Sequence, residues 1–299
     1  MTPSPAILAA LIAALFYALS DICLRNALRF STPISACIAT AAVEWVGFTA
    51  LALAGGLFPA LTLTGFLWFA LAGFLNPVLF LTFYLLGIQR IGVARSAPIK
   101  GSGPIFATAF AVVVMGERLT PVHYLGIGLA MTGIITISAE KPEKRPAAPG
   151  KLSAWGGGIG AVFPLLAGVS GGIASNIFKI SMTHVPSPLL GAWVGVTEGL
   201  LFYPLLAFLF PRENRFRFDA RRAWPWIAPA GLTAMVALYS VFYAVSLGQV
   251  PIVFTLVQTS PLFVILFSVL MLRRLERVSR RVIFGGLLTV GGGAWVILA

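Results

Sequence analysis

Three ionisable side chains stand inside long apolar stretches of this sequence, where their types could do chemistry. Glu44, Glu198 and Lys100 each lie well within such a stretch. A charge among apolar residues is costly unless it faces a polar cavity or a partner. A carboxyl in that setting can exchange protons, and an ammonium group can hold an anion. We therefore expect these three residues to contact a small polar solute or a proton. Hydrogen bonding between helices is the alternative for the two glutamates.

Other polar side chains in the apolar stretches could line the same cavity. They are Tyr17, Asn76, Tyr84, Asn176, Tyr239, Tyr243 and Gln258. Each is weak evidence alone, since tyrosine also gathers at membrane interfaces. Asn76 is the strongest of them, because Pro77 follows it and places its amide beside an expected break in a helix. Asp21, Arg25 and Lys179 lie nearer the ends of their stretches, where long basic side chains can reach the interface.

Several kinds of chemistry have no signature in the sequence. The P-loop pattern GxxxxGK[ST] does not occur, and the two histidines, His123 and His184, lack metal-ligand spacing. Cys23 and Cys37 read as packing residues. We expect no catalytic residue, no cofactor and no metal. A membrane-embedded enzyme for lipid-linked substrates would need histidines or acids gathered at one membrane face, so it stays a remote alternative.

The composition indicates which elements must position these residues. The chain has 299 residues, of which 59% are hydrophobic and 10% charged, with a mean hydropathy of +0.95. A soluble domain needs far more polar surface. Ten apolar blocks are long enough to cross a bilayer: 5–24, 33–56, 65–88, 93–115, 121–138, 157–180, 187–210, 223–247, 250–272 and 281–298. We expect an all-α integral membrane protein with ten transmembrane helices. The first block has no basic residue before it, which argues against a cleaved signal peptide.

The sequence repeats itself. The stretch GPIFATAFAVVVMGERLT, residues 103–120, returns as SPLFVILFSVLMLRRLERVS, residues 260–279, and Glu44 aligns with Glu198. We therefore expect two five-helix halves, 1–138 and 157–299, joined by a Pro-rich charged linker, 139–156. Five is odd, so the second half enters the membrane in the opposite sense. Two inverted repeats around a central cavity are the result.

Prolines and glycines recur within the repeat. Pro104 and Pro261 fall about halfway along the expected helices 93–115 and 250–272, so both could act as hinges, with simple packing kinks as the alternative. Small residues recur at seven-residue spacing in the last helix of each half: Gly126, Gly133, Gly285 and Gly292. Such residues let membrane helices approach closely. These two helices are expected to be scaffold, or a dimer surface.

The positive charges predict an orientation. Most of the 21 Lys and Arg residues lie in or beside the loops after the first, third, fifth, seventh and ninth blocks. Short basic loops stay in the cytoplasm. The distribution therefore predicts that both termini face away from it. The net charge of +12 records these loops and not a nucleic-acid partner.

Two five-helix halves, each with a proline, an apolar run, Glu-Arg-aliphatic-Thr/Ser and a Gly-rich helix, resemble the drug/metabolite transporter superfamily. Within it the chain is similar to the ten-helix EamA-type permeases. The resemblance spans nearly all of both halves, although the second copy has two extra residues between Pro261 and Glu276 and a more basic loop. It also implies that the first four helices of each half surround the cavity. Many such relatives are expected to keep both termini in the cytoplasm, against the charge distribution.

The resemblance implies a secondary transporter of the cytoplasmic (inner) membrane and not an enzyme. Its expected partners are a small-molecule substrate, the lipid bilayer and protons as a candidate coupling ion, with a monomer or homodimer as the assembly. Export of small polar metabolites by alternating access is the first reading, with amino acids as the first substrate. A permease of the same fold for drugs, sugars or sugar phosphates is the alternative. A sugar phosphate would require several central cations, and only Lys100, Arg25 and Lys179 qualify.

Overall fold

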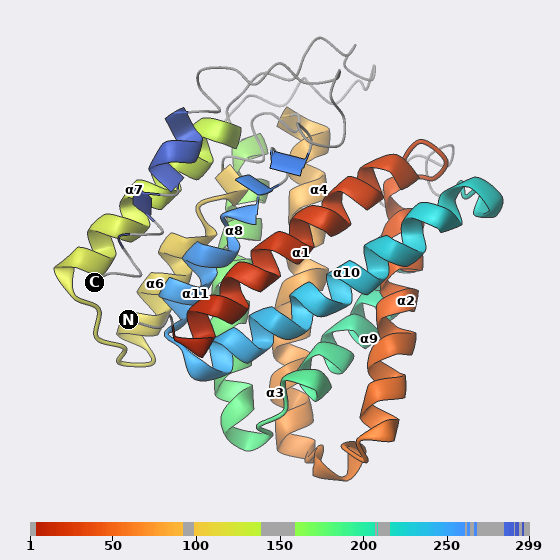
Figure 1. Ribbon diagram of the computed structural model, residues 1–299, viewed down its shortest axis with the longest axis horizontal. Coiled ribbons are helices and arrows are strands. Elements are labelled where there is room, and N and C mark those ends of the chain that lie inside the picture. Colours follow the sequence, from red (N-terminus) through yellow and green to blue (C-terminus); the bar gives the residue numbers. More distant parts are fainter. Residues whose placement is uncertain are drawn as a thin grey trace.

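The computed structural model describes residues 4–91, 99–138, 159–206, 208, 216–260, 262–263, 266–267, 284–289, 291–292 and 295. Across these residues the regular structure is helical, apart from one isolated bridge between Ser31 and Phe218 (Figure 1). The expected all-helical membrane architecture is confirmed. Within the described residues, six helices are long and apolar enough to cross a membrane: Pro5–Ala27, Pro33–Ala54, Leu63–Gly87, Gly160–His184, Pro188–Leu206 and Ala220–Leu247.

The helices of the first half follow the expected apolar blocks. They are α1 (Pro5–Ala27), α2 (Pro33–Ala54), the 3₁₀ turn η1 (Phe58–Ala60), α3 (Leu63–Gly73), the π-helical turn η2 (Phe74–Leu79), α4 (Phe80–Ile91), α6 (Gly103–Val113) and α7 (Pro121–Ser138). The third expected block thus comprises α3, η2 and α4 in succession.

The described helices of the second half follow in the same order. They are α8 (Ile159–His184), α9 (Pro188–Leu206), α10 (Ala220–Leu247) and the short α11 (Val250–Val257). Among the described helices, α10 and α8 are the longest. Residues 284–289 are also helical.

Hydroxyl and carboxyl side chains define where several helices begin. Ser4, Thr32, Thr62 and Asp219 each accept a hydrogen bond from the backbone N–H three residues later. Pro5 and Pro33 follow two of these caps, at positions where the missing N–H of proline has no helical partner to lose.

The expected break at Asn76 is confirmed. Asn76 has non-helical backbone angles, φ −145° and ψ 111°, inside η2, and the Asn76–Pro77 peptide bond is cis. Pro77 has no N–H to donate, so the α-helical ladder cannot continue through it. The third apolar block is therefore two helices joined by an irregular turn.

The fourth apolar block differs from its prediction. Pro104 was expected halfway along a continuous helix, but residues 101–102 form a turn and α6 begins at Gly103, which places Pro104 in its first turn. The prediction of a mid-helix proline is wrong here, because glycines at 101 and 103 disfavour helix and proline fits a first turn. Pro261 lies outside the described residues.

Helices of the two halves pack against one another in matching pairs. The α1 helix runs along α10, and α8 packs against α3, η2 and α4 (Figure 1). The α2 helix packs against α9, α10 also contacts α2, and α3 also contacts α9. On α1, the contact face is alanine-rich, and Ala10, Ala13, Ala14 and Ala18 are fully buried. Small side chains allow this close approach of membrane helices.

The repeated glycines bring α7 onto the C-terminal segment. A methyl group at Gly133 would collide with the backbone around Gly285 and Thr289, and one at Gly292 would collide with Gly126 and Ala130. The contact is thus reciprocal between the two copies of the spacing. These glycines pack against each other within one chain, as the scaffold interpretation predicts.

Candidate functional site

Polar groups from both halves of the chain gather around Tyr17. Tyr17, midway along α1, interacts electrostatically with Glu44 of α2 and with Asp21, one turn further along its own helix. Tyr203 of α9 interacts with Tyr17, Glu44 and the Cys37 thiol. We name this group the Tyr17 cluster. Its members are Tyr17, Asp21, Cys37, Glu44 and Tyr203, together with Phe80, Tyr84 and Lys100, which are described next.

Lys100 supplies the positive charge of the Tyr17 cluster. Its Nζ atom lies 4.6 Å from the ring centroid of Tyr84 and 5.4 Å from that of Phe80, both on α4. Ring faces attract a cation without using up its three N–H donors. Asp21 interacts electrostatically with Lys100 and with Tyr84, which links the cation to an acid of α1.

The side chains of the Tyr17 cluster interact electrostatically without hydrogen bonds between them. Across the described residues, the side chains of Tyr17, Asp21, Glu44, Lys100 and Tyr203 form no hydrogen bond or ion pair with protein groups. Asp21 is exposed, and the other four are partly buried. Polar groups at membrane depth that keep their donors and acceptors unused can receive a solute that carries complementary groups.

The structure brings together four residues that the sequence singled out: Tyr17, Glu44, Tyr84 and Lys100. It adds Asp21, which sequence reasoning had placed near a helix end, and Tyr203, which it had missed. The signal for Asp21 was its four-residue spacing from Tyr17, which puts both on one face of α1. No comparable signal marked Tyr203.

Two matching hydrogen bonds fix the register of α2 against α9. The Trp45 indole N–H donates to Thr197 Oγ1 at 3.1 Å, and the Trp193 indole N–H donates to Thr49 Oγ1 at 2.9 Å. Residue numbers rise along one helix as they fall along the other, so the helices are antiparallel. The same register puts Glu198 level with Glu44.

The surroundings of Glu198 nevertheless differ from those of Glu44. Its carboxyl packs directly against Gly73, the last residue of α3, where even a methyl group would collide with Oε2. That oxygen is buried, and no described residue forms a hydrogen bond with it. Glu198 therefore lies at the contact of α9 with α3, apart from the neighbours of Glu44.

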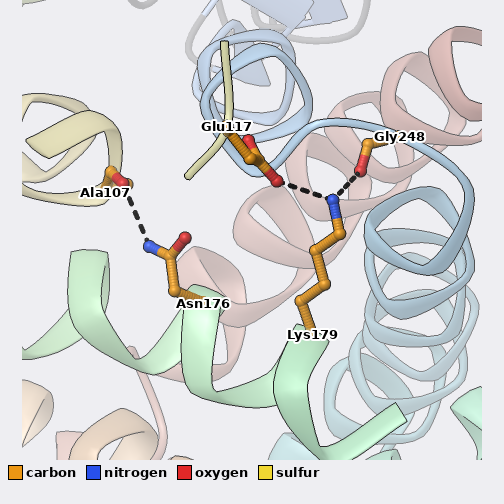
Figure 2. A network of polar contacts seen from close by, with 5 residues as sticks. All are labelled: Ala107, Glu117, Asn176, Lys179 and Gly248. Carbon is orange, nitrogen blue, oxygen red and sulfur yellow. Dashed lines mark hydrogen bonds and ion pairs between the residues drawn. The ribbon is translucent and has the colours of Figure 1, made fainter. Parts of the chain in front are cut away.

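A second polar network, which we name the Lys179 network, consists of Lys179, Glu117 and Gly248 (Figure 2). Lys179 Nζ of α8 lies 2.6 Å from Glu117 Oε1, in the connection between α6 and α7, and donates to the Gly248 carbonyl at 2.8 Å. Gly248 in turn packs on Ala6 near the start of α1. The partner of Glu117 is thus a cation 62 positions further along the sequence.

Asn176 lies one turn before Lys179 on α8. Its side chain is completely buried, and Nδ2 donates to the Ala107 carbonyl at 3.0 Å (Figure 2). The same nitrogen donates to the Gly172 carbonyl, also at 3.0 Å. The amide thus ties α8 to α6. Its Oδ1 atom is buried and has no hydrogen-bond partner in the part of the chain that the structure describes.

The remaining predicted site residues lie outside the Tyr17 cluster. Tyr239 and Tyr243 stack on each other along α10 with ring centroids 6.2 Å apart, and each is 40% exposed. Asn76 is exposed at the break in η2, and Gln258 is partly buried at the end of α11.

Comparisons with known proteins agree with this architecture. The model of the EamA-like transporter family matches residues 4–139 and again 158–298. A solved structure described as "Crystal structure of protein" matches with a TM-score of 0.79 over 99% of this chain and 98% of that one. The two sequences are 18% identical, so this match shows the fold alone. No curated protein matches the chain.

The chain belongs to the EamA-like transporter family, within the drug/metabolite transporter superfamily, and carries two EamA domains. The resemblance found in the sequence is therefore confirmed. Members of this family are multi-pass membrane transporters and not enzymes, so the remote alternative of a lipid-modifying enzyme is wrong.

Proposed function

We propose that this protein exports amino acids or similar small polar metabolites across the cytoplasmic (inner) membrane, and that the Tyr17 cluster binds the solute. One observation carries the proposal. The Lys100 cation interacts with the Asp21 carboxyl, and Tyr17 interacts with both Asp21 and the Glu44 carboxyl, while no hydrogen bond within the described residues uses up these side chains. An amino acid presents both a carboxylate and an ammonium group, so it fits both kinds of charge.

Each group of the cluster has a role in this proposal. Lys100 holds the solute carboxylate, and Asp21 and Glu44 face its ammonium group. The rings of Phe80 and Tyr84, which lie beside Lys100, offer an apolar surface for the solute side chain. Tyr17 and Tyr203 add hydroxyl groups that can donate or accept.

The alternative substrates fit this cluster less well. A sugar phosphate carries about two negative charges near neutral pH and calls for several cations. In the described part of the cluster Lys100 interacts with the acid Asp21, and a second acid, Glu44, interacts with Tyr17, so both carboxyls would repel such an anion. A sugar needs no cation. The mixture of charges supports a zwitterion over either.

Alternating access is proposed to operate through two inverted five-helix repeats around a central cavity. The matching contacts between the halves support this arrangement: α1 with α10 corresponds to α8 with α3, η2 and α4, and α10 with α2 corresponds to α3 with α9. Inverted repeats of this kind place the solute at their interface. The irregular turn at residues 101–102, just before Pro104, is the proposed hinge on the side of the first half.

The positions of the two polar networks support an order of events. The Tyr17 cluster extends from the middle of α1 toward its C-terminal end, whereas the Lys179 network contacts the N-terminal end. The basic loops predict that the C-terminal end of α1 faces the cytoplasm. In this reading the solute enters the cluster from the cytoplasm while the Lys179 network closes the opposite face.

Solute exchange by the purified protein in liposomes tests this function. Vesicles loaded with an unlabelled amino acid should take up the labelled one by counterflow, and vesicles loaded with a sugar or a sugar phosphate should not promote its uptake. Counterflow of a labelled sugar phosphate, with none for any amino acid of a full panel, would assign the protein to the alternative class of permease.

A further inference from the structure

We propose that Glu198 is a proton-binding site distinct from the Tyr17 cluster, and that its proton is exchanged for the exported solute. This inference rests on the proposed transport function and assigns separate tasks to the two glutamates that the sequence repeat pairs. Glu44 belongs to the solute site. Glu198 belongs to the contact between α9 and α3.

The environment of the Glu198 carboxyl disfavours its ionised form. Glu198 Oε2 is buried, has no hydrogen-bond partner among the described residues and packs against Gly73 so closely that no side chain fits between them. An ionised carboxylate without a partner at membrane depth is strongly disfavoured. The direct contact also leaves no room for a metal cation on that side of the oxygen. A proton is the ligand that this contact can accommodate.

The Glu198 carboxyl lacks a compensating charge on the described helices around it. The titratable or charged side chains on the described helices packed against α9 are Cys37 and Glu44 on α2, Lys179 and His184 on α8, and Arg221, Arg222, Tyr239 and Tyr243 on α10. The α3 and η2 segments carry none, and Tyr203 is the nearest on α9 itself. Among these described groups, none interacts electrostatically with Glu198. Within the described part of the chain, no cation balances its negative charge.

The contact of Glu198 with Gly73 lies beside an irregular turn of the backbone. Gly73 is the last residue of α3, directly before the irregular turn that contains Asn76 and Pro77. It stands four residues before Pro77, so its carbonyl receives no α-helical hydrogen bond from that position. Breaks of this type in membrane helices line binding sites in transporters. A neutral Glu198 can pack on this junction, whereas an ionised one favours separation of α9 from α3 and access to water.

In the proposed exchange, Glu198 binds a proton on one side of the membrane and releases it on the other. The carboxyl takes one proton from the aqueous phase on the side to which the solute is released. After the transporter reorients, the same proton leaves to the cytoplasm as Glu198 becomes exposed there. Proton and solute therefore move in opposite directions, and no other reactant is required.

Two transport assays on purified full-length protein in liposomes test the assignment. Glu198→Gln carries a permanently neutral side chain of the same shape, so it should keep solute counterflow, which needs no net proton movement. It should lose at least ten times in accumulation driven by a pH gradient. Full pH-driven accumulation by Glu198→Gln would overturn the inference, as would loss of counterflow together with driven accumulation. Counterflow by the wild type without any pH-driven accumulation would also overturn it, while leaving the proposed function intact.

Infrared difference spectroscopy gives a readout that does not depend on transport. The carbonyl-stretch band of a protonated carboxylic acid should titrate in the wild type and in Glu44→Gln and be missing in Glu198→Gln. Gly73→Ala should shift the midpoint of that titration because its methyl group displaces the carboxyl. Gly195→Ala, one turn before Glu198, is the matched control, since a methyl group there meets no atom within 4 Å. A band unchanged in Glu198→Gln would overturn the proton site even if no solute in the panel is transported.

Discussion

Lys179 of α8 forms an ion pair with Glu117, at 2.6 Å between Nζ and Oε1, and this contact links the second half of the chain to the first. The Glu117 side chain is 10% exposed and that of Lys179 is 27% exposed. The same ammonium group donates to the Gly248 carbonyl. One side chain thus connects α8 with the α6–α7 and α10–α11 connections near the start of α1.

Removal of this cation should destabilise the protein. Lys179→Met leaves the largely buried Glu117 carboxylate without its partner, which costs about 3–5 kcal/mol in comparable buried pairs. We expect a clear fall in the midpoint of thermal unfolding in detergent, and Glu117→Gln in the same chain should recover part of it. Arg222→Met is the control, because its pair with Asp219 is long, at 3.7 Å, and exposed. Equal midpoints for Lys179→Met and Arg222→Met would contradict a structural role for the ion pair.

The glycine contact between α7 and the C-terminal segment yields a second prediction. Gly133→Val introduces a side chain where even a methyl group collides with the backbone of residues 285 and 289. Overpacking of this kind costs about 1–3 kcal/mol. Gly128→Ala on the same helix should be neutral or slightly stabilising, since a methyl group there meets nothing within 4 Å. Thermal unfolding of both variants decides the point, and an unaffected Gly133→Val would show that this packing is not needed.

Much of this scaffold could be predicted from the sequence because it depends on local rules. Apolar length predicts the helices, Asn76–Pro77 predicts a break, and the seven-residue glycine spacing predicts close packing. The apolar length of the fourth block predicts a continuous helix through Pro104. The glycines at residues 101 and 103 interrupt that helix, so the prediction from length was wrong. Helix continuity in the fourth block is decided by the local preferences of three residues.

The site could be predicted only in part, because contacts across the repeat have no sequence signal. Tyr17 and Lys100 were found through their polarity among apolar neighbours. The pairing of Lys179 with Glu117, and the indole bonds of Trp45 and Trp193, join residues on different helices whose register depends on the whole bundle. Glu44 and Glu198 looked equivalent for the same reason, yet their neighbours differ.

A third prediction concerns the hinge before Pro104. With Cys23 and Cys37 replaced by serine, spin labels on the exposed residues Val113 of α6 and Leu71 of α3 report the angle of α6. The distance between the labels should change when solute is added, because the turn at residues 101–102 frees α6 to tilt. Labels on Leu71 and Leu205 serve as the reference pair. An unchanged distance from Val113, with transport intact, would indicate rocking of rigid bodies in place of bending.

A fourth prediction concerns orientation. The Lys and Arg residues are concentrated in alternate loops, so both termini are expected to face away from the cytoplasm. A C-terminal fusion to a reporter that fluoresces only in the cytoplasm should be dark, and a fusion to an enzyme active only outside it should be active. The opposite pattern would reverse the orientation, and with it the direction in which the Tyr17 cluster is loaded.

The most direct test of the solute site is competition for amino-acid counterflow in wild type and Lys100→Met. In the wild type, an unlabelled amino acid should compete strongly, whereas the amine and the carboxylic acid of the same skeleton should each compete weakly. A charge-assisted hydrogen bond contributes about 1.5–3 kcal/mol, so Lys100→Met should weaken amino-acid binding roughly ten- to a hundredfold. The same variant should leave competition by the amine unchanged. Unaltered amino-acid affinity in Lys100→Met, or equal competition by all three compounds in the wild type, would contradict a zwitterion site at the Tyr17 cluster.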